Sequence, residues 1–137
     1  MGRGMKVDRP AYEAILAHAR AGYPNEACGI LAGKPSEEVS SVFYAMRNLD
    51  ESSISYFMDP KEQLVVFKRM REEGLEMRGI VHSHVASEAY PSQKDVRLAF
   101  YPDVSYLIVS LSDREHPVLR SFRITEETVS EETLSVV

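Results

Sequence analysis

The chain has 137 residues, 44% of them apolar and 27% charged, and it carries a formal net charge of −5. These values are typical of one globular domain, and the negative charge argues against a nucleic-acid-binding protein, which needs a basic face. No apolar stretch is long enough to span a membrane, and the single cysteine, Cys28, excludes an internal disulfide and a multi-cysteine zinc site. We therefore expect a cytoplasmic protein with one domain over residues 1–137, in which 1–4 are a disordered extension and 126–137 a tail or edge strand.

Hydrophobic periodicity predicts strands that alternate with helices, which indicates an α/β domain with a mixed sheet flanked by helices. Asp8 is expected to cap the first helix and Gly22 to end it. The predicted elements are, in chain order, a helix over 10–22, strands over 28–33 and 41–48, an extended piece over 55–58, a helix from 60 to Gly74, a strand over 78–84, a short helix over 92–101, and strands over 106–112 and 118–124.

The second predicted helix begins with a sequence that resembles a capping box. Asp59 would be the cap, Pro60 the first helical residue, and Glu62 the acidic partner three residues after the cap. The side chains expected to share one face of this helix are Leu64, Phe67, Met70 and Arg71.

Two histidines, His82 and His84, stand one residue apart at the end of the strand predicted over 78–84. On a helix, side chains two residues apart point about 200° from each other and could not share an ion. On a strand they face the same side about 6.5–7 Å apart, which suits chelation of one metal ion. Each histidine alone has an ordinary alternative, a structural residue held by a hydrogen bond.

Ser92 and Asp95 follow after a polar loop and have two interpretations. Ser-x-x-Asp ahead of an apolar run is itself a capping box. The same helix start would bring Asp95 towards the histidines, and two histidines with one carboxylate make the three protein ligands of a catalytic zinc with an open fourth position. Both interpretations can hold at once. Such a site also needs a base, for which Glu26 is the candidate, although it could equally be a solvated loop residue.

The full pattern of Glu26, His82-Ser83-His84, seven residues, Ser92, two residues and Asp95 resembles the signature of the JAMM (MPN+) metallopeptidases. The resemblance covers roughly residues 5–125 and includes Asn48 and the FMDP stretch at 57–60. It implies a cytidine-deaminase-like (JAMM/MPN) fold and one zinc per chain, held by His82, His84 and Asp95. It further implies that Glu26 is the general base and proton shuttle and that Ser92 stabilises the tetrahedral oxyanion.

The activity that this resemblance implies is a zinc-dependent peptidase or isopeptidase. Its substrate would be the C-terminal tail of a ubiquitin-like (β-grasp) sulfur-carrier or modifier protein, and neither nucleic acid nor a membrane is expected as a partner. The compact chain favours a bacterial or archaeal carrier, because ubiquitin-specific relatives have insertions around the site. The oligomeric state stays open, with a homodimer among the options.

Three other functions compete with this one. A non-catalytic MPN scaffold usually lacks the ligand set, which is complete here. A RadC-like DNA-repair-associated protein has His-Asn-His-Pro where this chain has His-Ser-His-Val, and the acidic charge also argues against it. Zinc deaminases need a Cys-x-x-Cys pair that this chain lacks.

The remaining reactive side chains have ordinary interpretations. Cys28 lies at the start of an apolar strand and is expected to be a buried core residue rather than a nucleophile, since reactive thiols need an electropositive, accessible setting. His18 and His116 are expected on the surface.

Overall fold

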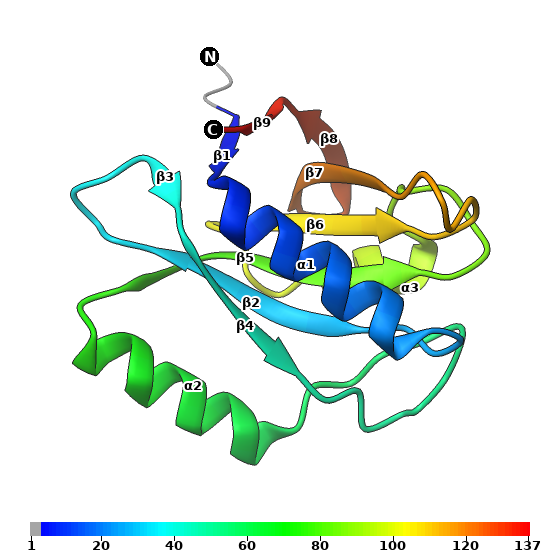
Figure 1. Cartoon of the computed structure of the whole chain (residues 1–137), viewed down its shortest axis with the longest axis horizontal. Coiled ribbons are helices and arrows are strands. Elements are labelled where there is room, and N and C mark those ends of the chain that lie inside the picture. The colour runs from blue at the N-terminus through cyan, green and yellow to red at the C-terminus, as the bar shows by residue number, and fades with distance from the viewer. Residues whose placement is uncertain (1–3) are drawn as a thin grey trace.

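The computed structural model describes residues 4–137, so most of the extension expected at 1–4 lies outside the described residues (Figure 1). A mixed six-stranded sheet in the order β4-β2-β5-β6-β7-β8 forms the centre of the molecule, and a small sheet, β3-β1-β9, lies beside it. The elements are β1 (Met5–Val7), α1 (Arg9–Gly22), β2 (Cys28–Gly33), β3 (Val39–Ser40), β4 (Val42–Met46), α2 (Pro60–Glu72), β5 (Glu76–His84), α3 (Gln93–Arg97), β6 (Ser105–Ser110), β7 (Val118–Thr125), β8 (Thr128–Glu132) and β9 (Leu134–Val136).

Helices cover both faces of the large sheet, as the alternating pattern predicted (Figure 1). On one face α1 packs against a core that includes Val81 of β5, and on the other face α2 packs against a core that includes Ile80. Because side chains alternate along a strand, His82 and His84 share the face of Ile80. Val96 and Ala99, in and just after α3, pack on the same core, so α2 and α3 lie on the face that carries the histidines.

The first helix forms as its sequence predicts. The Asp8 carboxylate accepts a hydrogen bond from the Ala11 N–H at 2.9 Å, and Pro10 occupies the first turn, where no N–H is needed. Its buried stripe consists of Ala11, Ile15, Leu16 and Ala19. This stripe packs in one core with Leu31 of β2, Val81 of β5 and Leu107 of β6, which holds the helix on the sheet.

Two expectations about α2 were wrong. Asp59 does cap the helix through the Lys61 N–H at 2.9 Å, but Glu62 accepts a hydrogen bond from the Arg47 N–H at 2.9 Å instead of closing a capping box. Glu62 therefore joins α2 to the end of β4. The buried face also differs from the expected one: Val66 and Met70 are buried and Phe67 is half-buried, whereas Leu64 is 70% exposed and Arg71 is exposed.

The ends of the chain pair with each other. β1 lies parallel to β9, with Met5 opposite Leu134, and β8 forms the edge of the large sheet beside β7. No strand was predicted at β1, and residues 126–137 were expected to form either a tail or an edge strand. Two further elements are shorter than expected: 55–58 forms a single bridge between Asn48 and Met58, and α3 ends at Arg97.

Two expectations about the whole protein stay predictions, namely one domain over 1–137 and a cytoplasmic location. Within residues 4–137, no helix is both long and apolar enough to cross a membrane.

Candidate active site

The end of β5 and the start of α3 bring three ligand atoms together. His82 Nε2 and His84 Nε2 lie 3.2 Å apart, and Asp95 Oδ2 lies 3.2 Å from the first and 3.0 Å from the second. A tetrahedral zinc with ligands at about 2.0–2.1 Å needs its ligand atoms about 3.3 Å apart. The triangle has nearly this size, and two imidazoles with one carboxylate are ligands that suit zinc, so the residues present fit the ion.

The start of α3 shows that the cap and the ligand interpretations of Asp95 are compatible. Ser92 Oγ accepts a hydrogen bond from the Asp95 N–H at 3.1 Å, and the Ser92 N–H donates to Asp95 Oδ2 at 2.9 Å. These two bonds form the predicted capping box. The oxygen that closes the box is the one that faces the histidines, so the cap holds the carboxylate in the position that a metal ligand would need.

A backbone carbonyl orients His84. The Glu88 carbonyl oxygen lies 2.9 Å from His84 Nδ1, and a proton on that nitrogen leaves the lone pair of Nε2 free for a metal. Burial alone would lower the pKa of His84, but the hydrogen bonds to Asp95 and Glu88 outweigh it and raise the pKa. The pKa of Asp95 lies below its usual range, since hydrogen bonds with His82 and His84 outweigh the effect of burial.

Glu26 lies two residues before β2, next to the end of β5, and the charges of His84 and Asp95 act on its pKa. It is 7% exposed, and this burial raises its pKa from 4.5 to about 7. A carboxyl that titrates near neutrality can accept and release a proton at physiological pH. The interpretation of Glu26 as a solvated loop residue is therefore wrong.

Ser83 and Asn48 attach the Glu26 segment to the rest of the site. The Ala27 N–H donates to Ser83 Oγ at 2.8 Å, and the Ser83 N–H donates to the Ala27 carbonyl at 2.9 Å. Asn48 Nδ2 donates to the carbonyls of Glu26 at 3.0 Å and Ser55 at 2.9 Å. Neither residue was predicted to have a role, although Ser83 lies inside the His-Ser-His motif and Asn48 is among the features that resemble the family.

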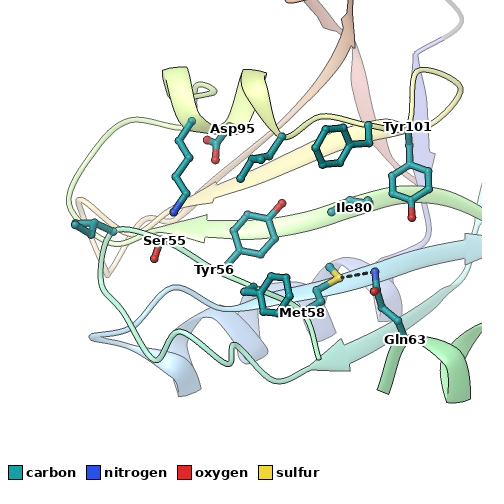
Figure 2. Close-up of a pocket in the computed structure, with 12 residues that line it drawn as sticks. Ser55, Tyr56, Met58, Gln63, Ile80, Asp95 and Tyr101 are labelled. Carbon is teal, nitrogen blue, oxygen red and sulfur yellow. Dashed lines mark hydrogen bonds between the residues drawn. The ribbon is translucent and has the colours of Figure 1, made fainter. Parts of the chain in front are cut away.

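A cleft of about 280 Å³ opens beside Asp95 (Figure 2). The segment 54–58 lies on one side and Tyr101 on the other, with Ile80 between them and Asp95 at one end. Leu98 and Phe100 also line the cleft. Several lining side chains are strongly exposed although apolar, including Phe100 at 71%. An exposed apolar cleft next to convergent polar groups is the usual form of a binding site.

The structure places the other reactive side chains outside the candidate active site, and one of them differs from its expected location. Cys28 is buried, and this burial raises its pKa to about 12, so it remains a thiol. His116 is exposed and pairs with Asp113 at 3.1 Å, as expected of a surface residue. His18 is not a surface residue: it is half-buried, and its Nε2 lies 3.0 Å from the carbonyl oxygen of Cys28 and 3.1 Å from that of Met46.

Comparison with known proteins identifies the family. A family model described as prokaryotic homologs of the JAB domain matches residues 8–125. A CysO-cysteine peptidase from Mycobacterium tuberculosis is 43% identical over 124 residues, which cover 90% of this chain and 85% of the relative. A desampylase from Haloferax volcanii is 33% identical over 109 residues, 76% of this chain and 78% of the relative.

Solved structures agree with this assignment. The solution structure of a protein from Desulfitobacterium hafniense superimposes with a TM-score of 0.87 at 44% identity, covering 97% of this chain and 92% of that one. A structure described as a JAMM metalloprotease-like zinc site in the proteasome and signalosome shares the fold, with a TM-score of 0.62 at 22% identity and 97% of both chains covered. The chain therefore belongs to the prokaryotic JAB-domain branch of the JAMM metallopeptidases and is a hydrolase of the JAMM type.

Proposed function

We propose that the chain is a zinc peptidase or isopeptidase that cuts an amide bond at the C-terminal tail of a ubiquitin-like sulfur-carrier or modifier protein. One observation carries the chemical part: three ligand atoms converge within 3.2 Å of one another beside the buried carboxyl of Glu26. The names of two relatives, a CysO-cysteine peptidase and a desampylase, support the substrate class.

His82, His84 and Asp95 would hold one zinc per chain. A bound zinc acts as a Lewis acid and lowers the pKa of a water molecule to about 7. Glu26 would take the proton of the attacking water and deliver it to the leaving amine, a task that suits its pKa of about 7. Ser92 Oγ accepts the Asp95 N–H and keeps its own hydrogen, which it would donate to the carbonyl oxygen as negative charge develops there.

The cleft beside the ligands would hold the substrate tail. Its apolar walls suit an extended peptide, and the backbone N–H and C=O groups of Tyr56 form no hydrogen bond with any residue in 4–137. An extended tail beside 54–58 could pair with these groups as an added strand. The scissile bond would then lie at the end of the cleft occupied by Asp95.

The test is to offer the zinc-loaded protein every β-grasp carrier of its own genome, with and without C-terminal extensions, and to measure cleavage by mass spectrometry. We expect cleavage at the tail of at least one carrier, and its loss after treatment with a chelator. Absence of cleavage of every carrier by zinc-loaded protein would favour the non-catalytic scaffold.

A variant tests the assignment of the base. Glu26→Gln should keep one zinc per chain while turnover falls by about 10²–10⁴, because the ligands remain and only proton transfer is lost. Glu72→Gln removes a carboxylate from the exposed surface of α2 and serves as the control, with wild-type turnover expected. Loss of zinc from Glu26→Gln would overturn the role of Glu26 as base.

A further inference from the structure

The two histidine ligands are held in different ways. His84 has a hydrogen-bond partner for its second ring nitrogen, the Glu88 carbonyl at 2.9 Å. His82 does not: its Nδ1 is fully buried and has no hydrogen-bond partner within residues 4–137. Metal-binding histidines almost always use this second nitrogen to fix the rotation and tautomer of the ring. Something else must therefore set the rotation of the His82 ring.

The ring of Tyr56 lies flat against the ring of His82. The two centroids are 4.5 Å apart and the planes differ by 21°, which is a stacked arrangement. Figure 2 shows the Tyr56 ring in the cleft, between Met58 and Asp95. A ring stacked on one face of an imidazole restricts its rotation, since any turn out of the parallel arrangement brings the two rings into collision.

Asn48 fixes the backbone on both sides of Tyr56. Its Nδ2 donates to the Ser55 carbonyl at 2.9 Å, and its Oδ1 accepts from the Phe57 N–H at 2.9 Å. The same Nδ2 also bonds to the Glu26 carbonyl at 3.0 Å. The backbone that carries Tyr56 is thus held in place on both sides, so the aromatic ring keeps a fixed position against His82.

We propose that Tyr56 is a positioning residue of the metal centre, which holds the His82 imidazole by stacking so that Nε2 faces His84 and Asp95. Stacking here replaces the missing hydrogen bond at His82 Nδ1. The inference rests on the proposed function, because it takes the triangle to be a zinc site. Tyr56 also lines the cleft, so a substrate tail seated there would contact the same ring that orients a metal ligand.

The test is the zinc affinity of the purified, metal-free chain, measured by competition with a chromophoric chelator. Replacing an outer partner of a ligand typically lowers metal affinity by about 10–100-fold, and we expect this for Tyr56→Leu. Tyr56→Phe keeps the ring and should restore wild-type affinity. Tyr12→Leu removes a half-buried tyrosine from α1, on the opposite face of the sheet, and should leave zinc affinity unchanged.

A spectroscopic measurement separates positioning from a general loss of stability. The visible absorption bands of the cobalt-substituted protein report ligand geometry, and we expect them to shift in Tyr56→Leu and to match the wild type in Tyr56→Phe. Should the leucine variant not fold, Tyr56→Met fills the space with a flexible side chain and allows the same two measurements. Unfolding of both variants would count against the proposal, because the ring would then support the fold rather than the ligand.

The two proposals fail in different ways. A wild-type protein that binds no zinc would refute the proposed function itself. A folded Tyr56→Leu with wild-type zinc affinity and cobalt spectrum, in a protein that does bind zinc and cleave a carrier, would refute only the role of Tyr56.

Discussion

The buried carboxyl of Glu26 should destabilise the metal-free protein, and replacing it with an amide should remove this cost. Glu26 is 7% exposed, and burial raises its pKa from 4.5 to about 7 against the opposing charge of His84. A raised pKa means that folding disfavours the charged carboxylate. Glu26→Gln keeps the shape of the side chain and removes the charge, so it isolates the electrostatic cost of placing a base in this position.

The size of the effect follows from the difference in pKa between the folded and unfolded states. Each unit corresponds to about 1.36 kcal/mol, so a rise from 4.5 to about 7 corresponds to about 3 kcal/mol. The carboxyl is not completely buried, and the screening that this residual exposure permits reduces the expected effect to about 1–3 kcal/mol. Below pH 4.5 the group is protonated in both states and the cost is absent; it grows as the pH rises and is complete above about pH 7.

Urea unfolding of the chelator-treated proteins measures this cost. We expect the free energy of unfolding of Glu26→Gln to exceed that of the wild type by about 1–3 kcal/mol at about pH 8, and by much less at about pH 5. The exposed control Glu72→Gln should change the free energy of unfolding by less than about 0.5 kcal/mol at both pH values. An equal increase in the free energy of unfolding at the two pH values, or no increase at about pH 8, would refute burial of charge as the cause.

Three further substitutions test the parts of the site separately. Asp95→Ala should release zinc, measured by metal analysis after dialysis, and retention of zinc with only a lower melting temperature would make Asp95 a cap alone. Ser92→Ala should keep zinc while kcat falls by about 10²–10³; an unchanged kcat would leave Ser92 with the cap alone. Ser83→Ala should lower the free energy of unfolding by about 1–3 kcal/mol, because the Ala27 N–H loses its partner. Ser135→Ala, an exposed serine of β9, is its control, and an equal effect there would contradict this account.

Local patterns predicted the elements that local interactions stabilise. The first helix begins with a bond between Asp8 and a backbone N–H three residues away, and its buried stripe follows the helical period. β1 and β9 have only three residues each and pair across nearly the whole chain, with Met5 opposite Leu134. A strand of three residues is too short to show an alternation of polar and apolar residues, so β1 could not be predicted from the sequence.

The errors in α2 have a tertiary cause. The partner of Glu62 is the Arg47 N–H, 15 residues before it in the chain, and that proximity exists only after β4 and α2 pack together. The buried face centres on Val66 and Met70 because these side chains meet the sheet, while Leu64 points to solvent. Hydrophobicity alone does not tell which apolar residues of a helix face the core when several faces contain them.

The residues of the candidate site also divide into those that a local sequence pattern predicts and those that no pattern marks. His82, His84 and Asp95 lie within 14 residues, so strand and helix geometry allowed them to meet, and the resemblance to the JAMM signature implied that they do. The carbonyl of Glu88 and the ring of Tyr56, which orient the two histidines, were not predicted. Any residue can supply a carbonyl, and an aromatic residue in an apolar stretch is usually part of the core, so neither has a pattern that marks it.

The position of Glu26, the proposed base, relative to the proposed ligands His82, His84 and Asp95 depends on strand register. Glu26 precedes β2, and β2 pairs antiparallel with β5 so that Cys28 lies opposite His82. A slip of one residue would turn every side chain of β2 to the other face of the sheet and would move Glu26 away from the ligands. The two bonds between Ser83 and Ala27 oppose such a slip at the end of the strands where the chemistry occurs. Ser83, between the two histidines, therefore connects three side chains that the local sequence brings together with a carboxyl that only the pairing of β2 with β5 places beside them.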